Sequence, residues 1–180
     1  MSRKIDFVNA VRIFTEAVGQ TTQKFNVQQT ALYTGLQLEE MAEKLEAILG
    51  GDSPIVQDLN ELSSSFKKGF CDEFILNADR EAMLDADIDL AWVAIGSAFS
   101  QGADVNGACA EVAVANLRKR RDCPACGGTG WRFEDNLHDD ECEMCSGRGV
   151  VAERDENGKV KKPEGWTPPD LKPFVKVEEL

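Results

Sequence analysis

Histidine is nearly absent from this sequence of 180 residues, in which His138 is the only one. A metal site on the helices expected in the first two thirds of the chain must therefore use oxygen ligands. Oxygen ligands favour Mg²⁺ or Mn²⁺, whereas zinc and iron sites usually include histidine or cysteine. His138 itself lies among four cysteines that are paired in sequence, so a second, different metal chemistry is expected there.

Basic residues are also few in comparison with acidic ones. The chain has 20 Lys and Arg against 32 Asp and Glu, which gives a formal net charge of −12 at pH 7. Such a charge argues against a broad electrostatic attraction to nucleic acid or to an anionic membrane. An anionic substrate would need a site that is locally neutralised by a metal ion or by clustered lysine and arginine.

Long hydrophobic runs are missing as well. No run approaches the roughly 20 apolar residues that cross a bilayer, so we expect no membrane partner. The start of the chain, Met1–Asp6, lacks the apolar segment of a secretory signal, and we expect a cytoplasmic protein. In a reducing compartment, paired cysteines indicate metal ligands rather than disulfides.

Residues 1–121 carry the apolar spacing of three and four that is typical of helices, and the hydrophobic fraction of 42% is enough for a single core. We expect an all-α domain of four or five helices. Gly50 and Gly51 should stop one helix, and Ser53 with Pro54 should begin the next. The expected helices span roughly residues 4–20, 28–49, 54–68 with a short continuation after Gly69, 78–101 and 105–118.

The helix expected over residues 28–49 carries Glu39, Glu40 and Glu43 within five residues. Glu40 and Glu43 are three apart and Glu39 and Glu43 are four apart, so either pair lies on one side of the helix. A solvated face of an amphipathic helix is the more common explanation of such a pattern. A metal site is the alternative, and it needs a second group of carboxylates nearby.

That second group lies on the helix expected over residues 78–101. Asp85 and Asp89 continue at helical spacing into Trp92 and Gly96, so this line predicts carboxylates that point inward. Inward carboxylates need a cation or a proton. Two such helices packed side by side would form a site for a hard divalent cation.

In combination, these residues resemble the MazG-like all-α nucleoside triphosphate pyrophosphohydrolases over roughly residues 5–120. The resemblance rests on Glu39–Glu40–x–x–Glu43, on the later acidic pair, and on Glu111 followed by Asn116 and Lys119. The family usually shows Glu-x-x-Asp in its second acidic motif. Here Ala86 stands three positions before Asp89, and Asp85 is the expected replacement.

The resemblance implies hydrolysis of a (deoxy)nucleoside triphosphate to the monophosphate and pyrophosphate. It implies Mg²⁺ or Mn²⁺ as cofactor and a homo-oligomer, because so few helices do not close a core alone. Glu39 or Glu43 would accept the proton of the attacking water, and Asn116 and Lys119 would hold phosphate oxygens. The implied metal ligands are Glu40, Glu43, Asp85 and Asp89.

Residues 122–150 differ in composition from the helical part. Cys123 with Cys126 and Cys142 with Cys145 form two Cys-x-x-Cys pairs, separated by 15 residues, which match tetrahedral zinc coordination. Each pair begins a copy of Cys-x-x-Cys-x-Gly-x-Gly, which resembles the DnaJ-type zinc finger with two repeats in place of four. A stabilising zinc site and a docking module for protein or nucleic acid both remain open.

Residues 151–180 are rich in lysine, glutamate and proline, so we expect a poorly ordered tail or an interaction arm. A second interpretation of the whole chain is a non-enzymatic scaffold. In it, the helices would serve dimerisation and the zinc finger would recruit a protein or nucleic-acid partner. Such a scaffold has no reason to bind Mg²⁺ with its acidic helices, which separates the two interpretations.

Overall fold

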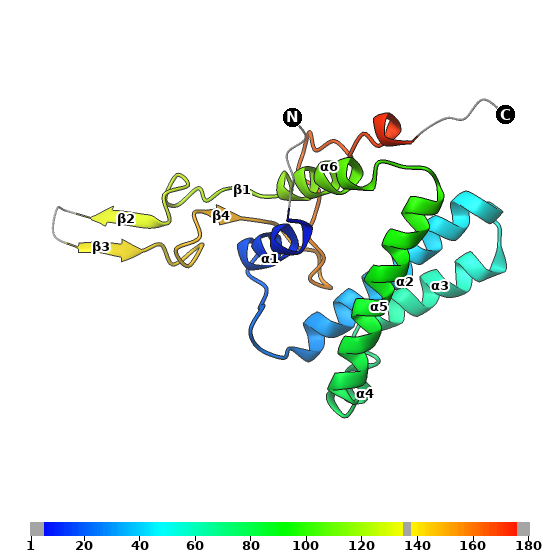
Figure 1. The fold of residues 1–180 in the computed structure, drawn as a ribbon. Coiled ribbons are helices and arrows are strands. Elements are labelled where there is room, and N and C mark those ends of the chain that lie inside the picture. The colour runs from blue at the N-terminus through cyan, green and yellow to red at the C-terminus, as the bar shows by residue number, and fades with distance from the viewer. Residues whose placement is uncertain (1–5, 135–137, 176–180) are drawn as a thin grey trace. The chain divides into compact units, whose positions relative to one another are not determined.

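The computed structural model describes residues 6–134 and 138–175. These form a mostly helical chain with four short strands and one 3₁₀ turn (Figure 1). The chain groups into two compact units, one of residues 1–22, 81–153 and 160–180, the other of residues 23–80 and 154–159. The helices are α1 (Phe7–Ala17), α2 (Val27–Leu49), α3 (Pro54–Lys67), α4 (Asp72–Leu76), α5 (Arg80–Ser100) and α6 (Val105–Leu117).

Helices α2 and α3 form an antiparallel hairpin whose ends follow the local signals of the sequence (Figure 1). The Asn26 side chain caps α2 by accepting from the backbone N–H of Gln29 at 2.9 Å. Gly50 ends this helix at a φ of 86°, which favours glycine. Pro54 opens α3 as expected, although the Ser53 side chain makes no capping hydrogen bond.

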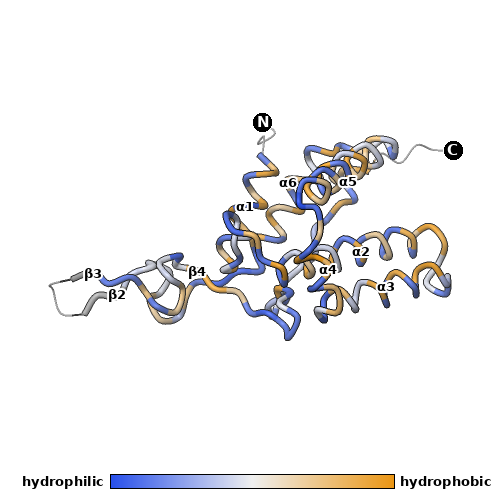
Figure 2. Tube along the Cα trace, turned by 90° about the horizontal axis from the view of Figure 1, so that it is seen from below, coloured by the Kyte–Doolittle hydropathy of each residue, from blue (hydrophilic) through white to orange (hydrophobic). Residues whose placement is uncertain are grey.

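The contact between α2 and α3 depends on a glycine. A Cβ placed on Gly35 would lie 2.6 Å from Lys67 Cγ and 2.8 Å from the carbonyl oxygen of Ser63. The Ser63 hydroxyl, which is buried, donates to the carbonyl of Gly35 at 2.7 Å. Apolar segments recur along both helices in Figure 2, and the small buried residues Ala31 and Ala42 lie on α2. Close packing here therefore rests on small residues and one buried hydrogen bond.

A turn from the C-terminal part of the chain belongs to the same unit as this hairpin. Asp155 Oδ1 accepts from the backbone N–H groups of Asn157 and Lys159, both at 2.9 Å. Gly158, at a φ of 87°, lies against Leu32 of α2. The local hydrogen bonds of an aspartate and a glycine at positive φ thus give residues 155–159 a defined shape.

In the other unit, residues 160–175 contact α6. The Trp166 indole donates to the carbonyl of Ala115 at 2.8 Å, and the backbone N–H of Asp104 donates to the carbonyl of Phe174 at 2.8 Å. The Phe174 ring lies so close to Gly107 that a Cβ there would come within 2.5 Å. The sequence predicts a poorly ordered tail or an interaction arm for residues 151–180, and the structure gives the described part, residues 151–175, specific contacts within the chain. A few large anchors, spaced among prolines, achieve this despite a polar composition.

Helix α5 differs from the other long helices in that none of its residues is buried. The line of Asp85, Asp89 and Trp92 is predicted to point inward, but all three are exposed, with Trp92 at 79%. This prediction is wrong for the isolated chain. The large exposed apolar residues of α5 are Leu84, Ile88, Leu90, Trp92, Val93, Ile95 and Phe99. No described helix is both long and apolar enough to cross a membrane.

Candidate functional site

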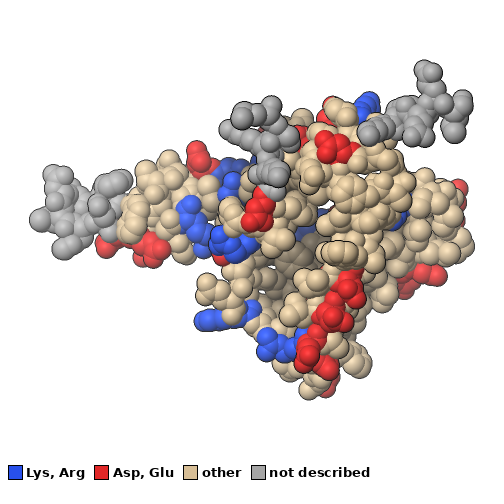
Figure 3. Space-filling model, in the orientation of Figure 1, with Lys and Arg blue, Asp and Glu red and all other residues tan. Residues whose placement is uncertain are grey.

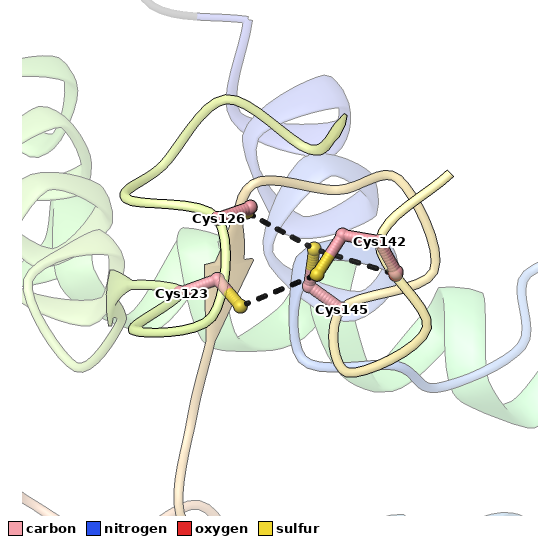
Figure 4. Close-up of side chains that lie close together, drawn as sticks. All are labelled: Cys123, Cys126, Cys142 and Cys145. Carbon is pink, nitrogen blue, oxygen red and sulfur yellow. Dashed lines mark hydrogen bonds between the residues drawn. The ribbon is translucent and has the colours of Figure 1, made fainter. Parts of the chain in front are cut away.

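The four cysteines of the C-terminal module come together as the sequence predicts. Their sulfur atoms lie within 4.8 Å of one another, and Figure 4 shows the side chains pointing toward a common centre. Cys123 Sγ is 3.8 Å from Cys142 Sγ, and Cys126 Sγ is 3.8 Å from Cys145 Sγ. A tetrahedral zinc ion with Zn–S bonds of about 2.3 Å holds its sulfurs about 3.8 Å apart. The donor set and its spacing therefore fit zinc.

The internal repeat of the sequence becomes a reciprocal pairing in space. Cys123 N–H donates to the carbonyl of Gly149, and Cys142 N–H donates to the carbonyl of Gly130, both at 2.8 Å. A Cβ on Gly130 would lie 2.3 Å from the carbonyl of Gly147, and both Gly130 and Gly149 have positive φ. The last glycine of each repeat is thus needed because the other repeat's backbone occupies the place of its side chain.

Backbone N–H groups point at two of the sulfurs, and the two thiols differ in pKa. Gly130 N–H points to Cys126 Sγ at 3.2 Å, and Gly149 N–H points to Cys145 Sγ at 3.3 Å. Desolvation raises the pKa of Cys126, but hydrogen bonds from the Gly130 and Gly128 backbone and from the Cys123 and Cys142 side chains together lower that pKa to about 6. Desolvation dominates at Cys145 and raises its pKa to about 11.

Two pairs of short strands belong to this part of the chain. Strand β1 (Arg121–Asp122) pairs with β4 (Val150–Val151), and β2 (Trp131–Glu134) pairs with β3 (His138–Glu141), both antiparallel. Cys123, Cys142 and Cys145 are fully buried, and all four cysteines are available as ligands. Four protein ligands leave no open position for a substrate, which is typical of a structural zinc site.

The acidic residues of α2 divide into two kinds. Glu40 and Glu43 are exposed, whereas Glu39 is 21% exposed and bonded at both oxygens. Lys67 Nζ lies 2.6 Å from Glu39 Oε2, and Lys159 Nζ bonds Oε1. Burial raises the pKa of the Glu39 carboxyl, but the bonds from Lys159 and Lys67 hold it below its ordinary value. Glu39 is therefore poorly suited to accept a proton, although the sequence makes it a candidate base.

Asp85 and Asp89 lie one turn apart on α5, in the other unit. Both are exposed, and acidic side chains cover the first half of α5 in Figure 3. Among the described residues, the four cysteines are the one group of histidine, cysteine and carboxylate side chains close enough to share a metal ion. Among the described residues, the carboxylates of α2 and of α5 thus form no such group.

Asn116 and Lys119, the predicted phosphate-binding pair, lie at the C-terminal end of α6. Asn116 is in the last turn of the helix, and its carbonyl accepts from the Lys119 N–H at 3.0 Å. The Lys119 ammonium lies 5.5 Å from the centre of the Trp166 ring, and Lys162 lies 5.0 Å from it. Lys119 is therefore in contact with the C-terminal segment, through an aromatic ring that attracts cations.

Three residues near the predicted sites are not found from sequence alone. Lys67 ends α3 and has no distinguishing motif, and Lys159 is 120 residues from its partner Glu39. Trp166 lies in a segment whose composition suggests disorder. The Asn157–Gly158 dipeptide is a turn signal that places Lys159 at a turn, but it says nothing of the helix that the turn meets.

Comparison of the chain with protein-family models, with curated proteins and with solved structures finds no match.

Proposed function

We propose that the protein hydrolyses a nucleoside triphosphate to the monophosphate and pyrophosphate with the help of Mg²⁺ or Mn²⁺. The observation that carries the proposal is the placement of Glu40 and Glu43, two exposed carboxylates three residues apart on α2, in the Glu-Glu-x-x-Glu pattern of the MazG-like enzymes. The exposed pair Asp85 and Asp89 on α5 supplies a second set of oxygens. Such a donor set, without histidine, suits a hard cation.

Glu40, Glu43, Asp85 and Asp89 would hold the cation. Bound Mg²⁺ would neutralise phosphate oxygens and acidify a water molecule, which is the chemistry that carboxylates alone do not supply. Glu43 is the candidate proton acceptor, because the carboxylate of Glu39 is already bonded to two lysines. The exposed Glu43 carboxylate would take the proton of the water as that water attacks the α-phosphorus. Asn116 and Lys119 would bind the phosphate chain.

The exposed apolar residues of α5 support a homo-oligomer as part of the proposal. Ile88 is 62% exposed and Trp92 is 79% exposed, and α5 contributes nothing to the core of its own chain. A helix of 21 residues with large apolar side chains exposed to solvent gains stability when another surface covers those side chains. We take a second copy of the chain as that surface, because the helices of one chain leave α5 uncovered.

The same observation favours the second candidate, a non-enzymatic scaffold that dimerises through α5 and recruits a protein or nucleic acid through the cysteine module. The two candidates differ in what they require of the acidic residues. A scaffold needs no divalent cation at Glu40 or Glu43, whereas the enzyme does.

The first experiment is a screen of ribo- and deoxyribonucleoside triphosphates with Mg²⁺ and with detection of pyrophosphate. Glu43→Gln, Glu40→Gln and Asp89→Asn should each lower turnover by roughly 100-fold or more while helicity is kept. Glu46→Gln is the matched control, since this exposed carboxylate lies on α2 outside the motif. Full activity in Glu40→Gln or Asp89→Asn would show that the residue is not a ligand, and no hydrolysis of any nucleotide would favour the scaffold.

A further inference from the structure

Glu39 lies between two lysines that come from separate segments of one compact unit. Lys67 ends α3 and contacts Oε2 at 2.6 Å, while Lys159 reaches Oε1 from the turn at residues 155–159. Two ammonium groups share one carboxylate, so one positive charge is left over at this point.

Both lysines are held by specific local structure. The stem of Lys67 lies in the space left by the missing side chain of Gly35, and its side chain is 17% exposed. The backbone of Lys159 is fixed by Asp155, whose carboxylate accepts from the Lys159 N–H at 2.9 Å. Gly158 places that turn against Leu32, one turn of α2 before Gly35. The two ammonium groups are therefore positioned without help from a ligand.

The pair keeps hydrogen-bonding capacity for a ligand. An ammonium group has three N–H donors, and the bond to Glu39 uses one of them on each lysine. The Lys159 side chain is 39% exposed, so solvent and solutes reach it. Glu43 lies one helical turn after Glu39 on the same side of α2 and is exposed. Of the candidate metal ligands, Glu43 therefore lies one turn of α2 from the carboxylate that holds the lysine pair.

We propose that Lys67 and Lys159 bind the phosphate chain of the substrate in addition to Asn116 and Lys119, with Glu39 as the residue that positions the two lysines. This inference rests on the proposed nucleotide hydrolysis. The neighbouring carboxylates Glu40 and Glu43 repel an anion, so the phosphate chain binds here together with a divalent cation. A triphosphate with one bound Mg²⁺ still carries negative charge. The two ammonium groups would donate charge-assisted hydrogen bonds to its phosphate oxygens.

The experiment measures binding in the full-length protein and does not depend on turnover. Inorganic tripolyphosphate with Mg²⁺ is titrated calorimetrically, and so are nucleoside triphosphates whose α,β-bridging oxygen is replaced by methylene. Lys159→Met and Lys67→Met should each weaken binding by roughly tenfold, the loss of one charge-assisted hydrogen bond. Lys161→Met, at an exposed lysine two residues further on, should bind like the wild type.

Lys159 lies on a turn and not within a helix, so its variant keeps the proposal testable even if Lys67→Met fails to fold. Wild-type affinity in Lys159→Met would overturn the proposal, and so would a wild-type protein that binds neither probe. If tripolyphosphate binds, the Lys159→Met variant loses it, and no nucleotide is hydrolysed, then the lysine pair stands and the proposed activity fails. If nucleotides are hydrolysed and Lys159→Met binds the probes normally, the activity stands and the lysine pair fails.

Discussion

The buried hydroxyl of Ser63, on α3, donates a 2.7 Å hydrogen bond to the carbonyl of Gly35, on α2. Because Gly35 is a glycine, α2 places no side chain between the two helices at this position. The carbonyl of Gly35 belongs to a helix, so it accepts this bond in addition to its place in the helical ladder. The same glycine makes room for Lys67, which then reaches Glu39. Helix packing and the charged group on α2 therefore depend on one small residue.

Gly35→Ala should destabilise the α2–α3 hairpin, because the new methyl group would meet the backbone of α3 as well as the Lys67 stem. Overpacking of this kind costs roughly 1–3 kcal/mol, measured as a fall in the free energy of unfolding in urea. Gly51→Ala is the control, since the nearest atom there is the end of the flexible Glu46 side chain at 3.1 Å. Equal stability of the two variants would contradict the packing described.

The paired lysines give Glu39 a pH-dependent share in stability. Its pKa in the folded protein is below the ordinary value of 4.5, so the charged carboxylate stabilises the fold above the unfolded pKa. That contribution is lost as pH falls through the folded pKa. The difference in unfolding free energy between wild type and Glu39→Gln should therefore be constant near neutral pH and shrink below about pH 4.5. A difference that is unchanged down to pH 3 would show that the ion pairs do not form.

Zinc should hold the cysteine module together, because a segment of this size has little core of its own apart from the cysteines. Chelation should abolish the dispersed NMR signals of residues 122–150 and leave the helical circular dichroism nearly unchanged. Cys142→Ser should lose the bound zinc, and Cys109→Ser, a half-buried cysteine of α6, should retain it. Loss of the helices on chelation would mean that the module is integral to the helical fold.

The exposed apolar face of α5 predicts self-association. Trp92→Ser should shift the protein toward the monomer in light scattering, because the 79% exposed indole is lost from the proposed interface. Trp131→Ser, at a tryptophan of β2 that is 47% exposed, serves as the matched control and should leave the mass unchanged. A wild-type protein that is monomeric at high concentration would refute the homo-oligomer.

The helix boundaries and the cysteine cluster could be predicted because their signals are local. Gly50 at the end of α2, Pro54 at the start of α3 and the Cys-x-x-Cys spacing act within a few residues. The contact of Lys159 with Glu39 could not be predicted, since it joins residues 120 apart. It also depends on the position of the turn at residues 155–159 relative to α2. The spacing around Asp89 predicts a buried line of side chains that is exposed in the structure, because spacing does not say whether the same chain supplies the covering surface.

The most direct test of the proposed activity is the fate of labelled oxygen. A nucleoside triphosphate that the protein consumes is hydrolysed in ¹⁸O-water with Mg²⁺, and the products are separated and weighed by mass spectrometry. Attack at the α-phosphorus places the label in the nucleoside monophosphate and leaves pyrophosphate unlabelled. Label in orthophosphate, with a nucleoside diphosphate as the other product, would contradict the account.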